Sequence, residues 1–195
     1  MFREGDVQHW WHPPSGRGVR ENGGQYTHGA IWAAMAFAAL GDSRRAWELT
    51  NMINPVNHAT SAADVGVYKV EPYVVSADVY GVAPHTGRGG WSWYTGSAGW
   101  MYRLIVESLL GLRLEVDKLH FAPCLPAEWQ SYQIHYRYRE TTYDVTVVQD
   151  HRRDVAVPGE MRVTVDGVEQ SGSVITLIDD RQPHSVEVSV RAATA

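Results

Sequence analysis

Residues 97–112, SAGWMYRLIVESLLGL, mark the point at which the hydrophobic pattern of the chain changes. The stretch itself predicts a helix, and Gly111 is the residue type that commonly follows the end of one. After Leu114 the sequence breaks into short runs in which β-branched or aromatic residues alternate with polar ones, which is typical of half-buried strands. The change predicts helices before this stretch and a sheet after it, which is an α+β fold.

Two further helices are predicted upstream. The run at residues 23–40 is apolar on nearly every side after Ile31, which is typical of a helix buried among other helices. Gly41 fits the position after its end, and Asp42 fits the N-cap of a second helix that Asn54-Pro55 ends. Two helices joined by so tight a turn form a helical hairpin.

The long connection between the second and third helices has a different character. Residues 55–94 show no long period and are rich in Pro, Gly, Asn and His. A connection of this length is usually a functional loop region. We expect one short helix within it, at residues 73–80.

Six strand-like runs follow the third helix. Turn signals such as Asp166-Gly167 separate them. We expect them to form an antiparallel sheet region arranged as a β-sandwich. The runs are LHFAP, SYQIHYRYR, TTYDVTVVQ, MRVTVDG, SVITLID and HSVEVSV.

Composition excludes several classes of partner. The chain has 195 residues, 44% of them hydrophobic, and a formal net charge of -5 without any run of Lys or Arg. That balance argues against a nucleic-acid or anionic-membrane surface. The one cysteine, Cys124, cannot form an internal disulfide, and its FAPCLP setting predicts a small buried side chain. The N-terminus lacks a basic segment followed by an apolar run, so we expect a cytoplasmic protein.

Aromatic residues give a first indication of function. The chain has 8 Trp and 10 Tyr against 3 Phe, an excess of rings with a polar group that suits sugar sites as well as cores. Five tryptophans are candidates to stack on glucosyl rings, with packing in the core as the alternative. They are Trp10, Trp11, Trp91, Trp93 and Trp100.

Two glycine-rich helix starts are candidate anion sites. Thr95 and Gly96 lie where a glycine-rich loop runs into the third helix, so backbone N–H groups, the helix dipole and a hydroxyl can converge on a phosphate. Alternatively, Thr95 caps the helix and the glycines only permit tight turns. Glu21 and His28 flank two glycines at the start of the first helix, where a histidine is otherwise a capping or core residue.

No metal site is expected. His9 and His12 stand three residues apart, while His120 and His135 belong to separate strand-like runs without acidic or cysteine partners at ligand spacing. The segment TGSAGW lacks the GxSxG spacing of a serine nucleophile.

Four ordered segments resemble consecutive motifs of the glycoside hydrolase family 94 phosphorylases, and especially the phosphorylase-type C-terminal region of cyclic β-1,2-glucan synthases. They are RENGGQYTHGAIWAAMA, VEPYVVSADVY, GRGGWSWYTGSAGWMYRLIVESLLGL and LHFAPCLPAEWQSYQIHYRYRETTYDV, within residues 20–148. The resemblance implies an (α/α)6 barrel followed by a β-sandwich. It also implies cleavage of a β-glucosidic bond by inorganic phosphate, with inversion and release of an α-sugar 1-phosphate.

The resemblance also assigns site residues. It implies that His28 in QYTH, with Thr95 and Gly96 in YTGSAG, holds phosphate, which is a co-substrate and not a cofactor. It implies that Glu21, with Arg20, contacts sugar hydroxyls. Arg17 in SGRGVR resembles the family's phosphate-binding arginine, whose planar fork matches phosphate oxygens.

The N-terminal segment departs from the family order. Residues 4–20, EGDVQHWWHPPSGRGVR, resemble an earlier loop of the family's barrel, but ENGGQYTH follows at once where the family has a long intervening stretch. The resemblance therefore implies an internal deletion near residue 20. We expect residues 1–20 to be a displaced barrel loop, residues 21–113 a partial barrel and residues 114–195 the sandwich.

The deletion removes the general acid. An inverting phosphorylase needs one carboxylic acid to protonate the leaving oxygen while phosphate replaces the water of a hydrolase. In the family this acid is the aspartate of a DWNDG-like motif, which the sequence lacks. Glu71, Asp78 and Asp64 are candidate substitutes, with solvated loop carboxylates or caps as the alternative. We assign no catalytic residue.

Two classes of function remain. The chain is expected to be a fragment of a phosphorylase that acts on β-glucan or β-glucoside oligosaccharides and is inactive alone. Alternatively, it is a non-catalytic carbohydrate-binding or structural module, or a decayed remnant. Barrel helices without their neighbours would expose Trp32, Met35 and Phe37 and favour a homo-oligomer. As part of a full-length synthase, the chain would be associated with the inner membrane.

Overall fold

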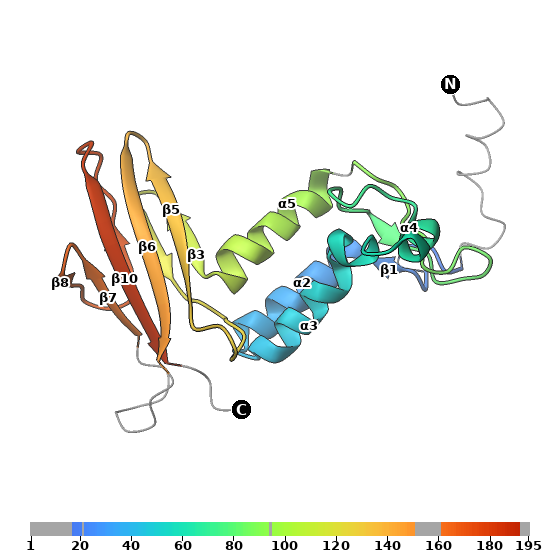
Figure 1. Ribbon diagram of the computed structural model, residues 1–195, viewed down its shortest axis with the longest axis horizontal. Coiled ribbons are helices and arrows are strands. Elements are labelled where there is room, and N and C mark those ends of the chain that lie inside the picture. The colour runs from blue at the N-terminus through green and yellow to red at the C-terminus, as the bar shows by residue number, and fades with distance from the viewer. Residues whose placement is uncertain (1–16, 21, 94, 151–160, 192–195) are drawn as a thin grey trace. The chain divides into compact units, whose positions relative to one another are not determined.

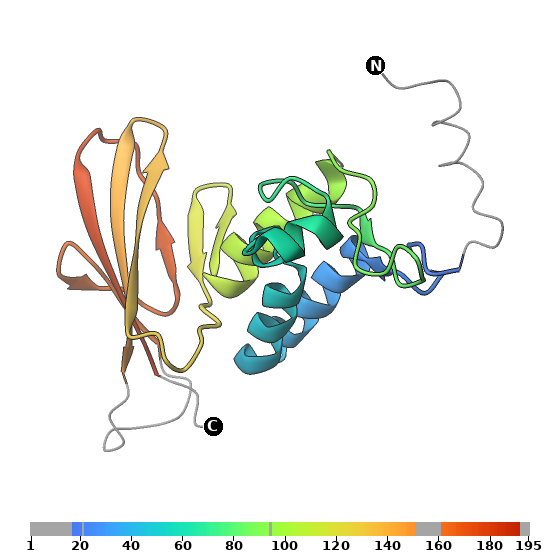
Figure 2. The same cartoon turned by 45° about the vertical axis from the view of Figure 1, so that its right-hand side comes forward.

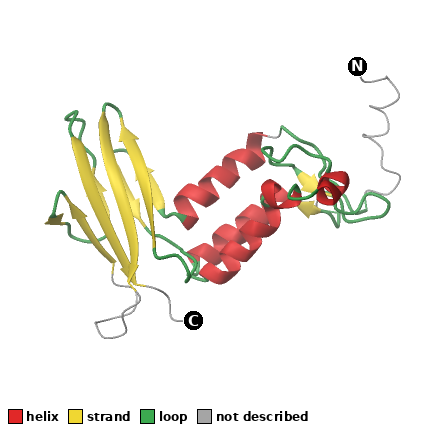
Figure 3. Cartoon of the chain, in the orientation of Figure 1, coloured by secondary structure: helices red, strands yellow, loops and turns green. Residues whose placement is uncertain are grey.

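The computed structural model describes residues 17–20, 22–93, 95–150 and 161–191. The chain divides into two compact units. Unit 1 comprises Met1–Ala34 and Glu48–Tyr102, and unit 2 comprises Met35–Trp47 and Arg103–Ala195. Most helices precede residue 104 and the sheets with more than two strands follow it (Figure 3). The expected α+β class is confirmed.

The predicted helical hairpin is present. Helices α2 (Thr27–Ala39) and α3 (Ser43–Ile53) lie side by side (Figure 1). Gly41 in their connection has a φ of +77°, which is favourable for glycine. Asp42 caps α3, since its Oδ1 accepts a hydrogen bond of 2.9 Å from the backbone N–H of Arg45. Gly41 and Asp42 therefore have the roles expected of them, after the end of one helix and at the N-cap of the next.

The long connection contains more structure than expected. It holds the 3-10 helix η1 (Pro55–His58), helix α4 (Ala62–Tyr68) and strand β2 (Asp78–Val79). The hydroxyl of Ser61 caps α4 by accepting from the N–H of Asp64, a Ser-x-x-Asp signal that the sequence carries.

The predicted helix at residues 73–80 is wrong. Its backbone groups bond to other segments: the N–H of Ala77 donates to the carbonyl of Trp91, and the carbonyl of Ala77 accepts from Thr27. Strand β2 pairs antiparallel with β1 (Gln25–Tyr26), which also explains why the first helix starts at Thr27 and not at residue 23.

The third helix matches its predicted end. Helix α5 (Thr95–Arg103) continues into the π-helix η2 (Leu104–Leu109), and Gly111 follows with a φ of +74°. A Cβ atom at Gly111 would collide with the backbone of Ala122, so glycine is also required by close packing.

Unit 2 contains two sheets. The three-stranded sheet has the order β3-β4-β9 and the five-stranded sheet the order β5-β6-β10-β7-β8 (Figures 1 and 2). All six predicted runs contain a strand. The strands are β3 (Leu112–Glu115), β4 (Lys118–Phe121), β5 (Ser131–Tyr138), β6 (Thr141–Asp150), β7 (Met161–Val165), β8 (Val168–Glu169), β9 (Val174–Thr176) and β10 (Pro183–Arg191).

One strand direction corrects the prediction of an antiparallel sheet. Strand β10 pairs antiparallel with β7 but parallel with β6, with Val186 opposite Val145. Alternation of apolar and polar residues has the same period in either direction, so it does not reveal the direction of a strand. The five-stranded sheet is therefore mixed.

Both sheets contribute to one hydrophobic core. Strand β6 alternates strictly, with Tyr143, Val145 and Val147 buried and their neighbours less so. Burial of such side chains supplies the main stabilising term of a domain. The cluster consists of Leu112, Leu119, Phe121, Leu125, Tyr143, Val145, Val147, Val163, Ile175, Leu177, Val186 and Val188.

Within the described ranges, no helix combines the length and apolar character that a membrane span requires.

Candidate functional site

The start of α2 is anchored to β2. Its first residue, Thr27, is buried, and the backbone N–H of Thr27 donates a hydrogen bond of 3.0 Å to the carbonyl of Ala77. The antiparallel pair of Tyr26 with Asp78 lies immediately before it. These contacts hold the following residue, His28, in the first turn of the helix.

His28 packs directly against the first turn of α5. Its Nδ1 lies 3.3 Å from the hydroxyl of Ser97. A Cβ atom at Gly96 would lie 2.9 Å from Cε1 of His28 and 3.2 Å from its Nε2. Only glycine leaves the imidazole ring its present place, so the structure brings the predicted residues His28 and Gly96 together.

A row of aromatic rings continues from His28. Its ring centroid lies 5.7 Å from that of Tyr26 and 5.9 Å from that of Trp32. Trp32 in turn meets Trp100 edge to face, with centroids 5.6 Å apart. Such ring contacts limit rotation of the imidazole.

The structure gives less detail for the other two predicted phosphate ligands, Thr95 and Arg17. Thr95 begins α5, but its side chain lies outside what the structure describes. Arg17 is exposed in the turn that precedes β1.

Of the predicted sugar-binding pair, the structure describes Arg20 alone. Glu21 lies outside the described residues. Arg20 has a φ of +49°, and its backbone N–H donates a 2.9 Å hydrogen bond to Oδ2 of Asp78. The bond ties the backbone at Arg20 to β2.

Asp78 is neither a solvated carboxylate nor a cap, which corrects the alternative offered for it. Its side chain is only 2% exposed, and a Cβ atom on Gly90 would collide with its carboxylate. Burial, and after it the negative charge of Asp78, raises the pKa of Tyr80. The bond to the Arg20 N–H makes Asp78 a structural acceptor for the turn.

Asp64 has the role of a helix-start carboxylate. The hydroxyls of Ser61 and Thr60 donate to it and lower its pKa from the usual value. A carboxyl held in its charged form is a poor proton donor at neutral pH. Glu71 accepts through its backbone carbonyl from the N–H of Val74.

The described candidate tryptophans have different surroundings, and Trp100 belongs to the aromatic row that continues from His28. Trp91 and Trp93 are exposed and Trp100 is half-buried, while Trp10 and Trp11 lie outside the described residues. His9 and His12 also lie outside them. Across residues 17–20, 22–93, 95–150 and 161–191, no group of three His, Cys, Asp or Glu side chains could hold a metal ion.

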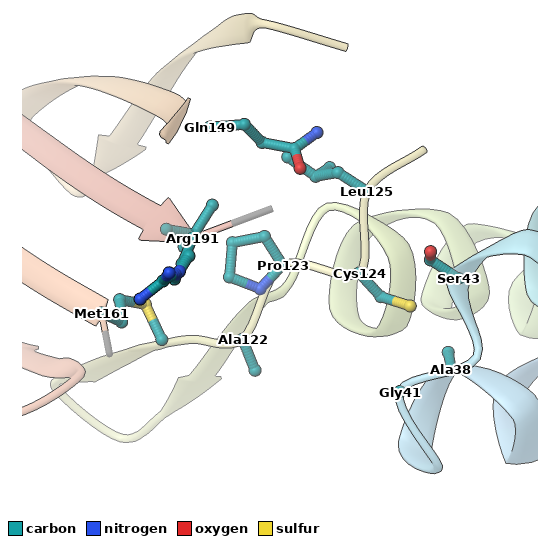
Figure 4. A pocket seen from close by; sticks show the side chains of 11 residues that line it. Ala38, Gly41, Ser43, Ala122, Pro123, Cys124, Leu125, Gln149, Met161 and Arg191 are labelled. Carbon is teal, nitrogen blue, oxygen red and sulfur yellow. The ribbon is translucent and has the colours of Figure 1, made fainter. Parts of the chain in front are cut away.

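Unit 2 contains a separate cavity of about 240 Å³ (Figure 4). The α2–α3 connection, the segment after β4 and the ends of β6, β7 and β10 line it. Cys124 is buried, as predicted, and this burial raises the pKa of its thiol. The amide of Gln149 donates to the carbonyls of Pro126 and Trp129. Among the predicted site residues whose side chains the structure describes, none lines this cavity.

Ser97 is the residue that sequence reasoning missed. Ser97 directly follows Thr95 and Gly96 in the segment YTGSAG, but the sequence pattern does not indicate that its hydroxyl faces His28.

Comparisons with known proteins cover most of the chain. Residues 15–111 match the Glycosyl hydrolase 94 superfamily, catalytic domain, and residues 112–171 match the Glycosyl hydrolase family 65, C-terminal domain. The chain is 52% identical over 141 residues to the cyclic beta-(1,2)-glucan synthase NdvB of Rhizobium meliloti (strain 1021), which covers 72% of this chain and 5% of the synthase.

Phosphorylases are also similar. The chain is 32% identical over 174 residues to solabiose phosphorylase of Paenibacillus borealis, covering 89% of this chain and 22% of that protein. It is 28% identical over 162 residues to 1,2-beta-oligoglucan phosphorylase of Listeria innocua serovar 6a, covering 76% and 15% respectively. The chain thus spans less than a quarter of each of these relatives. The catalytic-domain match, together with the 52% identity to the synthase over 72% of the chain, shows that the chain belongs to glycoside hydrolase family 94.

Proposed function

We propose that the chain binds inorganic phosphate and β-glucan or β-glucoside oligosaccharides as part of an inverting glycoside phosphorylase. The observation that carries this proposal is the packing of His28 against Gly96 at the first turn of α5. Backbone N–H groups and an imidazole N–H at such a place can donate together to one phosphate. The names of the relatives, which include phosphorylases and a β-1,2-glucan synthase, support the substrate class.

The remaining predicted residues complete the proposed site. Thr95 would add a hydroxyl donor and Arg17 a guanidinium to the phosphate oxygens. Glu21 and Arg20 would contact sugar hydroxyls from the turn that Asp78 anchors. A nucleophilic phosphate oriented in this way gains reactivity from positioning.

We propose that the chain is inactive alone. Phosphorolysis needs a proton donor for the leaving oxygen, and the sequence has no DWNDG-like motif. We assign residues 1–20 to a displaced loop, 21–113 to part of an (α/α)6 barrel and 114–195 to a β-sandwich, with a deletion near residue 20. Its proposed location is the cytoplasm, at the inner membrane if it belongs to a full-length synthase.

Two measurements test the proposal. Calorimetry with inorganic phosphate should show binding to the wild-type chain and at least a tenfold weaker affinity for His28→Ala, which corresponds to about 1.4 kcal/mol. His58→Ala is the matched control, because His58 is also half-buried but bonds to the carbonyl of Met52. Release of glucose 1-phosphate from β-1,2-oligoglucan and phosphate should be absent. A wild-type chain that does not bind phosphate refutes the proposal.

A non-catalytic module is the second candidate. Trp32 is 53% exposed, and an exposed indole face suits either a sugar ring or a second copy of the chain. Oligoglucan binding that is independent of phosphate and of His28 would favour the module.

Self-association that Trp32→Gln weakens, measured by sedimentation velocity, would support the proposed homo-oligomer.

A further inference from the structure

Ser97 is a buried hydroxyl directed at one nitrogen of His28. The residue is 0% exposed, and its Oγ lies 3.3 Å from Nδ1. A buried hydroxyl gains most when it both accepts and donates, and a neutral imidazole offers one acceptor and one donor nitrogen. The contact therefore bears on which nitrogen of His28 carries the proton.

The two ring nitrogens of His28 have different surroundings. Nδ1 faces Ser97, whereas Nε2 is the nitrogen that approaches the Cβ position of Gly96, where the first turn of α5 begins. Contacts with the rings of Tyr26 and Trp32 oppose a flip that would exchange the two nitrogens. The direction of the Ser97 hydrogen bond thus decides what Nε2 offers to a ligand at this turn.

We infer that Ser97 is a positioning residue, whose hydroxyl donates to Nδ1 and so keeps the proton of His28 on Nε2. This inference rests on the proposed function, since it gives Nε2 its role as a donor to a phosphate oxygen. In the opposite tautomer a lone pair on Nε2 would face the phosphate and repel it. Gly96 provides the space and Ser97 sets the tautomer.

Nitrogen NMR of histidine tests the inference without any ligand. The chain is labelled with ¹⁵N-histidine, and the His28 signals are identified by their loss in His28→Gln. The wild-type spectrum should show the tautomer protonated on Nε2. Ser97→Ala should shift His28 toward a mixture of tautomers, and Ser97→Thr, which retains the hydroxyl, should restore the wild-type pattern. Far-ultraviolet circular dichroism checks that each variant remains folded.

Phosphate binding then separates this inference from the proposed function. Calorimetry with inorganic phosphate should show an affinity about fivefold to tenfold lower for Ser97→Ala, as expected for loss of one hydrogen bond, and near wild type for Ser97→Thr. A wild-type His28 protonated on Nδ1, or a tautomer unchanged in Ser97→Ala, overturns the inference. If the tautomer responds to Ser97→Ala but no variant binds phosphate, the hydrogen-bond assignment stands and the phosphate proposal fails.

Discussion

The imidazole of His28 occupies the space that a side chain on Gly96 would need, because a Cβ atom there would lie 2.9 Å from its Cε1. At Gly99, one turn further along α5, no described atom other than those of its chain neighbours and its own helix backbone lies within 4 Å of the Cβ position. The same substitution at these two positions of one helix therefore has different consequences. The contrast gives a matched pair of variants for the candidate site.

Gly96→Ala should displace His28 and lower phosphate affinity at least tenfold, or about 1.4 kcal/mol. Gly99→Ala should leave phosphate affinity unchanged and stabilise the helix by up to about 1 kcal/mol, since alanine is the better helix former. Calorimetry with phosphate and urea unfolding measure the two effects. Equal phosphate affinities in the two variants would contradict a site between His28 and Gly96.

The bond from the Arg20 N–H to the buried Asp78 gives a second prediction. Asp78→Ala should destabilise the chain by about 1–3 kcal/mol, because the partly buried N–H of Arg20 loses its acceptor. Asp78→Asn keeps an acceptor oxygen and should cost less. Hydrogen exchange should show faster exchange of the Arg20 amide in Asp78→Ala, and an unchanged rate would refute the anchoring role.

The hydrophobic core provides a third prediction. Leu119 in β4 is fully buried, whereas Leu114, its partner in β3, is 45% exposed. Leu119→Ala should lower the free energy of unfolding by about 2–5 kcal/mol, because it leaves a cavity in the core. Leu114→Ala should cost about 0.5 kcal/mol or less. Urea denaturation compares the two, and similar losses would show that the two-sheet core is wrongly assigned.

His184 is held between two carboxylates in unit 2. Its Nδ1 lies 2.7 Å from Asp166 in the β7–β8 turn, and its Nε2 lies 3.2 Å from Asp180 before β10. Tyr143 of β6 stacks on the ring, with centroids 4.9 Å apart. The hydrogen bond to Asp166, ahead of that to Asp180, raises the pKa of His184, while the pKa values of both carboxyls are lowered.

These shifts predict the pH dependence of stability. The contribution of His184 is fully present below its ordinary pKa of about 6.5 and is lost as the pH rises through the raised value. The carboxylate contributions are present above about 3.9 and are lost as the pH falls through the lowered values. The cluster therefore stabilises the fold most in the acidic range between these limits.

Urea unfolding of wild type and His184→Gln from pH 5 to pH 9 measures this effect. The difference in unfolding free energy should be largest near pH 5 to 6 and should shrink as the pH rises. His135→Gln is the control, because His135 contacts Asp144 at the exposed surface of the same sheet, where ion pairs contribute little. A difference that grows with pH would contradict the assignment.

Short-range signals predicted the helix ends and one hairpin. Gly41, Asp42 and Gly111 act as expected because caps depend on residues within one helical turn. The Asp166-Gly167 turn has φ angles of +50° and +78°, as a two-residue hairpin loop demands. Alternation likewise located the strands within the six predicted runs, since each of these strands packs one face against a shared core.

The candidate site was only partly predictable. The segments QYTH and YTGSAG pointed to His28 and Gly96 through family resemblance, but nothing local indicated that the Ser97 hydroxyl faces the imidazole. Asp78 was a candidate proton donor with a solvated carboxylate or a cap as the alternative, and its burial follows from the pairing of β1 with β2.

Most of the secondary structure, the caps and the family followed from the order of residues, because each depends on neighbours in the chain or on recognisable motifs. Contacts between distant segments did not follow from the order of residues. The pairing that turned residues 78–79 into a strand, the parallel direction of β10 beside β6 and the meeting of His28 with Ser97 each depend on which backbone and side-chain groups come together across long loops. Packing and hydrogen bonding in the folded chain select those partners. The hydrophobic period of a single segment does not indicate which other segment it will contact.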